Sequence, residues 1–295
     1  MAGHGEQADA RGVTAVLLGA CLLGFAAMLV RWSSPAGPLV IGFYRMLFAL
    51  PLVLVMAWRE HRPGGGAGRG WALLAGLCFS GDLWMWHTSL NYTSVANSTL
   101  LIGLAPLWVA VISVAWLRAR LRKRFWFGLV LALAGGLVLG LAKGARWGTG
   151  RGEFLAALAS LAYASFTLAL AKSRQRLAAP EALAWVVACC TLCFGVLGLV
   201  EGEAFAGFPA RAWWALAGLG IVVQVVAWRL ITWGLGHVSA SLGSVTLMVQ
   251  PIATVILGWA LLGEAVRPLQ GAAILLVLAG IGFSALSPPL VEGGA

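Results

Sequence analysis

Charged residues are scarce in this sequence, and their scarcity decides the class of protein. Only 10% of the 295 residues are charged, against 61% hydrophobic, and the mean hydropathy is +0.91. A soluble domain carries roughly 25% charged residues. So few charges cannot cover a water-facing surface, which excludes a soluble globular protein. We therefore predict an all-α integral membrane protein, because a chain in lipid must satisfy its backbone hydrogen bonds internally.

Acidic residues are fewer still, with 10 Asp and Glu against 20 Lys and Arg. The basic residues stand in short runs between apolar segments, which is typical of membrane orientation signals and not of a nucleic-acid-binding surface. All five cysteines lie in apolar runs, and the group Cys189, Cys190 and Cys193 has no His or acid nearby, so we expect these thiols to pack as small apolar groups. We predict no metal site, no cofactor and no nucleic-acid partner.

What the chain has in abundance is apolar segments of about 20 residues, the length that crosses a bilayer. The first ends at Arg31 without a small-x-small cleavage site, so we interpret it as a retained helix and not a signal peptide. Short loops containing Pro, Gly or basic residues separate the segments. Ten can be marked: 13–31, 38–58, 71–90, 94–116, 125–142, 152–172, 181–200, 212–234, 238–261 and 268–287.

The two halves of the chain resemble one another. Leu90–Pro106 matches Leu235–Pro251 at a constant offset of 145 residues, and Leu133–Gly135 matches Leu278–Gly280. Each half has five spans, an odd number, so the second copy enters the membrane upside down. We therefore predict two inverted five-helix repeats, 1–145 and 146–295, around a central cavity, an arrangement common among transporters. Lys and Arg concentrate in the loops on the side of the termini, which predicts that both termini are cytoplasmic.

Polar residues inside the spans are costly in hydrocarbon, so each is a candidate functional residue. The third span holds Asp82 and Trp86, and the eighth holds Gln224 and Trp228 at matching positions of the repeat. Residues four apart share a helix face. These two faces are predicted to flank the cavity with aromatic walls and polar groups, and an indole face also attracts ammonium groups.

His87 aligns with Arg229 in the same comparison of the halves, and both are candidate cavity residues. A histidine titrates near neutral pH, so Asp82 and His87 are candidates for proton coupling, with a place near the headgroups left open for His87. Arg45, in the middle of the second span, has two interpretations: contact with an anionic substrate, or a structural partner. The structural alternative for Asp82 is an interhelical pair with Arg45 or Arg229.

Prolines mark two more spans as candidates to line the substrate path. Pro106 and Pro251 each remove a backbone donor and kink a helix, which is tolerated beside protein or a wet cavity. Near them, Asn97 and Gln250 are candidate substrate contacts, and Tyr163 in the sixth span is a further aromatic candidate.

Several short motifs occur in a fixed order, and together they resemble the drug/metabolite transporter superfamily in its ten-helix EamA-type branch, over nearly the whole chain. They are Gly42-Phe43-Tyr44-Arg45, the turn Asn91–Ala96, Pro106, Gln250-Pro251, Gly258–Glu264, Gln270-Gly271 and Ala279-Gly280. Two positions depart from the pattern of that branch. Arg118-Ala119-Arg120 stands where the first half would carry Gly-Glu, and Leu23-Gly24 stands where Trp-Gly is frequent.

The resemblance implies a multi-pass protein of the bacterial inner membrane that exports small metabolites by alternating access. The Trp-rich third span makes aromatic amino-acid exporters the nearest suggested members, so the expected substrates are amino acids or similar small amphipathic metabolites. Proton-coupled and facilitated transport both stay open. We expect a monomer in the lipid bilayer, with a dimer left open because Gly136 and Gly140 form a close-packing motif.

The sequence leaves two alternatives to amino-acid export. One is an exporter of drugs or cationic amphiphiles. The other is an intramembrane enzyme with a dyad of His237 and either Ser241 or Ser244, but the sequence around these serines lacks the usual glycine-flanked nucleophile. We therefore predict that the protein is not an enzyme.

Overall fold

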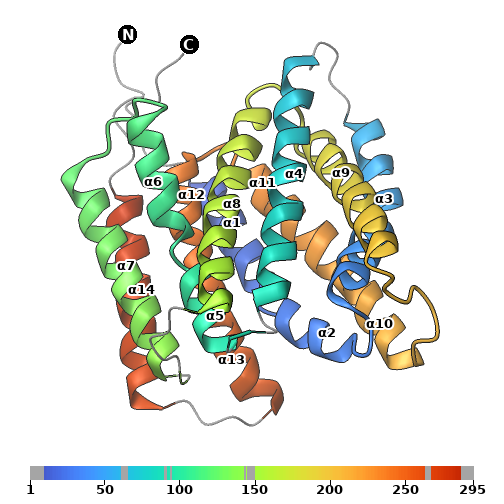
Figure 1. The fold of residues 1–295 in the computed structure, drawn as a ribbon. Helices are drawn as coiled ribbons and strands as arrows, with labels where there is room; N and C mark the ends of the chain where they lie inside the picture. The colour runs from blue at the N-terminus through green and yellow to red at the C-terminus, as the bar shows by residue number, and fades with distance from the viewer. Residues whose placement is uncertain are drawn as a thin grey trace.

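The computed structural model describes residues 10–60, 66–89, 92–93, 95–142, 144, 150–262 and 267–286, and this part of the chain is helical without strands. Within these described residues, eight helices are long and apolar enough to cross a membrane. Two further segments complete the ten predicted spans (Figure 1). They are the shorter apolar stretch Leu100–Ala115, which belongs to α5 and α6, and the helix α4, which contains polar residues. In chain order the spans are α1 (Ala10–Leu23) with α2 (Ala26–Trp32); α3 (Pro38–Arg59); α4 (Gly66–Ser89); α5 (Val95–Ile102) with α6 (Ala105–Ala115); α7 (Lys123–Ala142); α8 (Arg151–Arg174); α9 (Ala179–Val200); α10 (Ala210–Gly218) with η1 (Leu219–Ala227) and α11 (Trp228–Gly234); α12 (Ala240–Thr246) with η2 (Leu247–Val249) and α13 (Gln250–Leu262); and α14 (Pro268–Ala285).

The breaks predicted in the fourth and ninth spans are confirmed. A proline ring clashes with the carbonyl of the residue four positions earlier. Ile102, four residues before Pro106, is the last residue of α5, and Leu247, four residues before Pro251, begins the 3₁₀ turn η2. The eighth span is irregular without a proline, because η1 is a nine-residue π-helix. Such wide turns are rare and occur frequently at functional sites.

Packing between spans repeats when the two halves are exchanged. The second spans of the halves, α3 and α9, pack against each other, and so do the fifth spans, α7 and α14. The third span of the first half, α4, packs on the first span of the second half, α8. In the same way, η1 and α11 in the third span of the second half pack on α1, the first span of the first half. Since each half has five crossings, the halves have opposite directions, and the predicted inverted repeat is confirmed (Figure 1).

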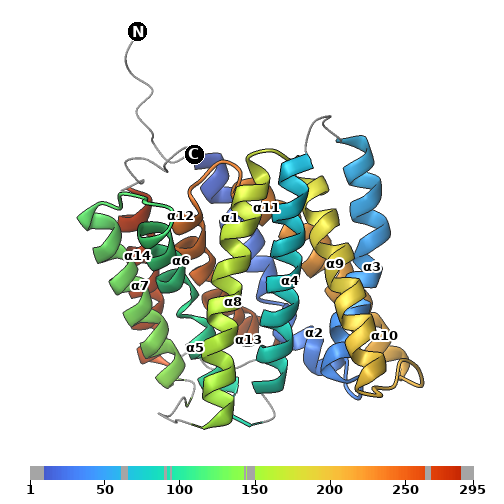
Figure 2. The same cartoon turned by 45° about the horizontal axis from the view of Figure 1, so that its top comes forward.

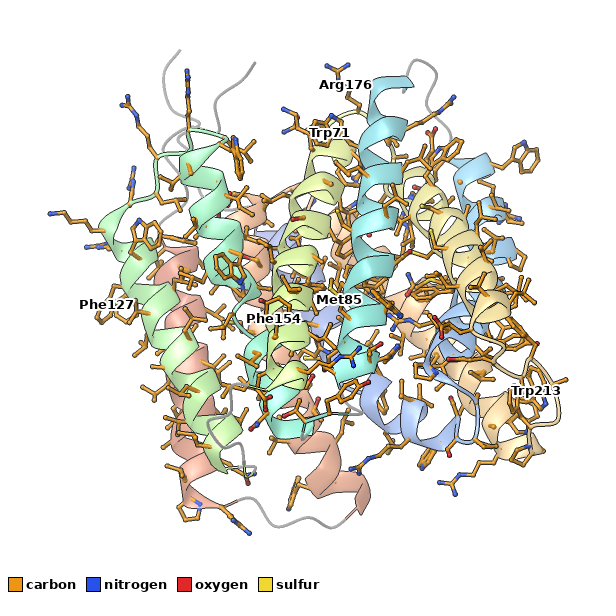
Figure 3. All side chains as sticks on the ribbon, viewed as in Figure 1. Trp71, Met85, Phe127, Phe154, Arg176 and Trp213 are labelled. Carbon is orange, nitrogen blue, oxygen red and sulfur yellow. The ribbon has the colours of Figure 1, made fainter. Side chains whose placement is uncertain are left out.

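The two ends of the bundle differ in their charged side chains. We call the end where α1 begins and α14 ends the terminal end (Figure 2). The basic segment between α6 and α7 lies there, and Figure 3 shows Arg176 at the same end, with Trp213 toward the opposite end. The outward-facing Phe127 and exposed Trp58 and Trp214 fit a lipid-facing surface.

Glycine allows α7 and α14 to approach closely. A Cβ placed on Gly280 would lie 2.5 Å from the backbone nitrogen of Ala132, whereas a Cβ on Gly282, on the same helix, would meet nothing within 4 Å. The motif glycines Gly136 and Gly140 face Met248 and Leu100 of the same chain at 3.2 Å. In this structure the motif therefore serves packing within the chain.

Replacing Gly280 with Ala is expected to destabilise the fold. The added methyl group forces α7 and α14 apart, and overpacking of this kind costs about 1–3 kcal/mol. Thermal unfolding in detergent should show a lowered midpoint. Gly282→Ala is the matched control, and it should keep or raise the midpoint because Ala favours a helix over Gly by about 1 kcal/mol. Equal effects of the two variants would contradict the close approach.

Candidate functional site

A buried polar pair joins the two halves of the protein. Arg45 of α3 donates from Nε to Oε1 of Gln224 in η1 at 2.9 Å, and the two residues are 5% and 0% exposed. The π-helical turn presents Gln224 toward α3, which packs directly on η1. The guanidinium carbon of Arg45 also lies 5.8 Å from the ring centroid of Phe79. A cation is thereby fixed in the middle of the bundle.

Four further groups lie near enough to Arg45 to interact with it electrostatically: Asp82, His87, Tyr163 and the thiol of Cys190. Asp82 and His87 are buried in α4, at 4% and 5% exposure. Within the described residues, Asp82 forms no hydrogen bond and no ion pair. The alternative pair of Asp82 with Arg229 is not formed, because Arg229 pairs instead with Glu60.

Hydrogen-bond donors near Arg45 are left without partners in the described part of the chain. They are Nε1 of Trp86, Nε2 of Gln224, Nε1 of Trp228 and the one N–H of the neutral His87 ring, whose other nitrogen is an acceptor that also has no partner. A buried donor without a partner costs about 1–3 kcal/mol, and buried polar groups are rarely left this way. Several such donors in one region point to a group that supplies acceptors when bound.

An aromatic layer bounds this cluster on its terminal side. Phe79 stacks on Phe166 with centroids 4.4 Å apart, and Trp228 meets their edges at 5.3 and 5.0 Å. All three rings are at most 2% exposed. Tyr163 approaches Phe166 at 5.8 Å from the side of the cluster. The layer separates the polar centre from the terminal end.

The structure thus brings together most of the predicted site residues: Asp82, Trp86, His87, Tyr163, Gln224 and Trp228, around Arg45. Asn97 lies elsewhere, where its Nδ2 donates to Glu153 at 3.0 Å and to Thr93 at 3.2 Å. These bonds tie α5 to the beginning of α8. The side chain of Gln250 makes no hydrogen bond within the described residues, and it begins α13, which packs on α1.

Some features of the site were not predicted from the sequence. Phe79 and Phe166 have no polar signal, although Phe79 stands three residues before Asp82 and shares its helix face. Glu60 follows α3 in a polar loop, and nothing in the sequence indicates its ion pair with Arg229. The predicted turn residue Asn91 and the motif residue Glu264 lie outside the described residues.

The conceivable dyad with His237 is not assembled. Nδ1 of His237 lies 2.8 Å from the carbonyl oxygen of Trp233, and its ring stacks on that indole at 4.0 Å. The hydroxyl of Ser241 donates to Ser113, and that of Ser244 donates to the carbonyl of Ser241. Neither serine uses His237 as a base in this structure.

Comparison with known proteins agrees with this architecture. The EamA-like transporter family matches the chain twice, at residues 10–141 and 150–286. The uncharacterized transporter YwfM of Bacillus subtilis is 27% identical over 252 residues, covering 83% of each chain. An uncharacterized transporter of Archaeoglobus fulgidus is 26% identical over 272 residues, covering 92% of this chain and 94% of its own.

A solved crystal structure with 18% sequence identity superposes with a TM-score of 0.79, over 93% of this chain and 98% of that one, which shows the shared fold. The double match of one family to the two halves agrees with the packing symmetry described above. With its apolar spans and transporter relatives, the chain is a multi-pass membrane transporter, and it belongs to the EamA-like transporter family.

Proposed function

We propose that this transporter exports amino acids or similar small amphipathic metabolites across the bacterial inner membrane by alternating access. The unpartnered buried donors around Arg45, with Asp82 nearby, are the observation that carries the proposal. The repeats 1–145 and 146–295 serve as the two halves that exchange conformation.

The chemistry of the cluster fits both ends of an amino acid. A carboxylate accepts hydrogen bonds from the guanidinium of Arg45 and from the free donors of Trp86, Gln224 and Trp228. An ammonium group balances Asp82, whose carboxylate has no hydrogen-bond or ion-pair partner within the described residues. The indole and phenyl rings supply apolar and cation-attracting walls for the rest of the solute. Protonation of Asp82 or His87 would couple transport to a proton gradient.

The orientation follows from charge. Basic loops gather at the terminal end, and the positive-inside rule assigns that end to the cytoplasm. The aromatic layer of Phe79, Phe166 and Trp228 then closes the central cluster toward the cytoplasm in this structure. Its opening is the conformational step by which a solute enters for export.

Replacing the indoles by phenyl rings tests the proposal directly. Trp86→Phe and Trp228→Phe remove one N–H donor each and keep an aromatic wall. A lost hydrogen bond to a charged group costs about 1.5–3 kcal/mol, so each variant should raise KM for amino acids about 10- to 100-fold. The measurement is uptake of radiolabelled amino acids into liposomes that hold the purified protein. Trp116→Phe, at a residue 81% exposed, is the matched control and should leave KM unchanged.

The same liposome assay separates the alternative substrates. Amphipathic amines without a carboxylate should be carried poorly, because they leave Arg45 and the indole donors unpaired. If such amines are carried well and amino acids are not, the export of cationic amphiphiles replaces our proposal. Saturable flux of neither class, across a broad panel of solutes, would refute the assignment of the central cluster as the substrate site.

A further inference from the structure

A polar pocket lies at the terminal end of the bundle, beyond the aromatic layer. Its volume is about 260 Å³, which is room for one compact solute or several waters. It opens where the end of α3, the turn from α8 to α9 and the end of α11 meet. Its lining residues are Glu60, Arg174, Ala178, Ala179, Arg229, Trp233, Gly236 and His237.

The lining carries two guanidinium groups and one carboxylate. Nη2 of Arg229 donates to both carboxylate oxygens of Glu60, each at 3.0 Å. Nε of Arg229 is buried and has no hydrogen-bond partner in the described part of the chain. An arginine that offers its full fork binds a carboxylate with two parallel bonds. Glu60 therefore leaves the Nε donor of Arg229 without a hydrogen bond.

Arg174 is held in place by main-chain oxygens. Its Nε donates to the carbonyl of Thr232 at 2.9 Å, and its Nη1 donates to the carbonyl of Leu177. A Cβ on residue 236 would lie 2.6 Å from Nη2 of Arg174, so Gly236 leaves the space that the guanidinium occupies. The backbone thereby fixes a second positive charge at the wall of the pocket.

Glu60 is the more exposed partner of this ion pair, so its carboxylate can leave Arg229 for solvent. Its side chain is 47% exposed, compared with 22% for Arg229, and it follows the last residue of α3. A carboxylate that enters the pocket gives Arg229 the same type of bond and can also use Nε. Trp228, the neighbour of Arg229 in sequence, belongs to the aromatic layer, so the pocket lies directly above the closure of the central site.

We propose that this pocket is a second oxyanion-binding site, which takes the carboxylate of a solute, and that Glu60 occupies Arg229 as a tethered substitute while the site is empty. Exchange of the two carboxylates frees the end of α3 from α11. The proposed export function is used only to identify the oxyanion as the carboxylate of the transported solute. Oxyanion binding itself does not require transport.

Acetate is the probe, with purified full-length protein in detergent and chloride replaced so that ionic strength is constant. Acetate should raise the thermal midpoint of the wild type. Glu60→Gln removes the internal competitor, and a ligand's apparent affinity rises as the fraction of competent protein rises. The acetate affinity of this variant should therefore increase about tenfold, the value for a site that Glu60 fills about 90% of the time. In the Arg229→Gln background, Glu60→Gln should no longer raise the acetate affinity, because any acetate bound there is held by the central cluster around Arg45 and not by this pocket.

Glu181→Gln is the matched control, because Glu181 pairs with Arg69 at 3.2 Å at the same end but outside this pocket. It should bind acetate as the wild type does. An acetate affinity that falls or stays equal in Glu60→Gln overturns the proposal, and this variant decides the matter even where Arg229→Gln does not fold. A response to dioctanoyl phosphatidylglycerol with none to acetate assigns the pocket to a lipid headgroup and also overturns it. Absence of amino-acid flux in liposomes would refute the proposed function and leave the acetate result standing.

Discussion

Replacing Arg45 with Gln is expected to abolish most transport, the largest effect of any single substitution in this protein. The change removes a buried charge that holds Gln224 and faces Asp82. Truncating one partner of a buried, hydrogen-bonded charge pair costs about 2–5 kcal/mol. The ratio kcat/KM for amino-acid flux in liposomes should therefore fall about 30- to 5,000-fold.

Arg59→Gln is the matched control for this experiment. Arg59 is an exposed residue at the end of the same helix, so its loss should leave flux within about fivefold of the wild type, as expected where surface charges contribute about 0–1 kcal/mol. Arg45→Lys adds a second comparison, because it keeps the charge and loses the planar fork. Flux near the wild-type level in Arg45→Gln, with the protein folded, would show that the central cluster does not bind the solute.

Replacing Asp82 with Asn is expected to have the second-largest effect. The buried carboxylate is the proposed partner of the ammonium group, and hydrogen bonds to charged groups contribute about 1.5–3 kcal/mol. KM for amino acids should rise about 10- to 100-fold. Deaminated analogues that keep the carboxylate should lose much less, because they never used Asp82.

The same variant distinguishes the two modes of transport. Flux is measured with and without an imposed pH gradient, beside Glu201→Gln as an exposed acidic control at the end of α9. In a proton-coupled transporter whose coupling group is Asp82, the gradient stimulates the wild type and the control but not Asp82→Asn. Stimulation that survives in Asp82→Asn moves the coupling role to another group, with His87 the next candidate.

The large features of the fold were predictable because they depend on composition and period. Lipid requires long apolar spans, and Pro106 and Pro251 break their helices wherever the helices lie. The correspondence of Asp82 with Gln224 could be predicted because the two residues occupy equivalent positions in the two repeats. These properties belong to the local sequence, so no knowledge of packing was needed.

Contacts between distant segments were not predictable in the same way. The hydrogen bond from Arg45 to Gln224 depends on the wide turn of η1. No residue type in Leu219–Ala227 predicts a π-helix. Asn97 is a polar residue within an apolar span, which suggested that it lines the cavity. It instead links α5 to α8 by a hydrogen bond to Glu153. The rings of Phe79 and Phe166 have the same sequence appearance as lipid-facing phenylalanines, and only packing distinguishes them.

The nine-residue π-helix breaks the symmetry between the halves. Its counterpart in the first repeat, α4, is an unbroken α-helix from Gly66 to Ser89. Each turn of a π-helix takes in more residues than an α-turn, so converting one into the other rotates every side chain that follows. If the halves trade conformations during a cycle, α4 must widen as η1 tightens, turning Asp82 and Gln224 in opposite senses. The irregular turn would then pass from η1 to α4 and back in each transport cycle, marking which side of the membrane the carrier faces.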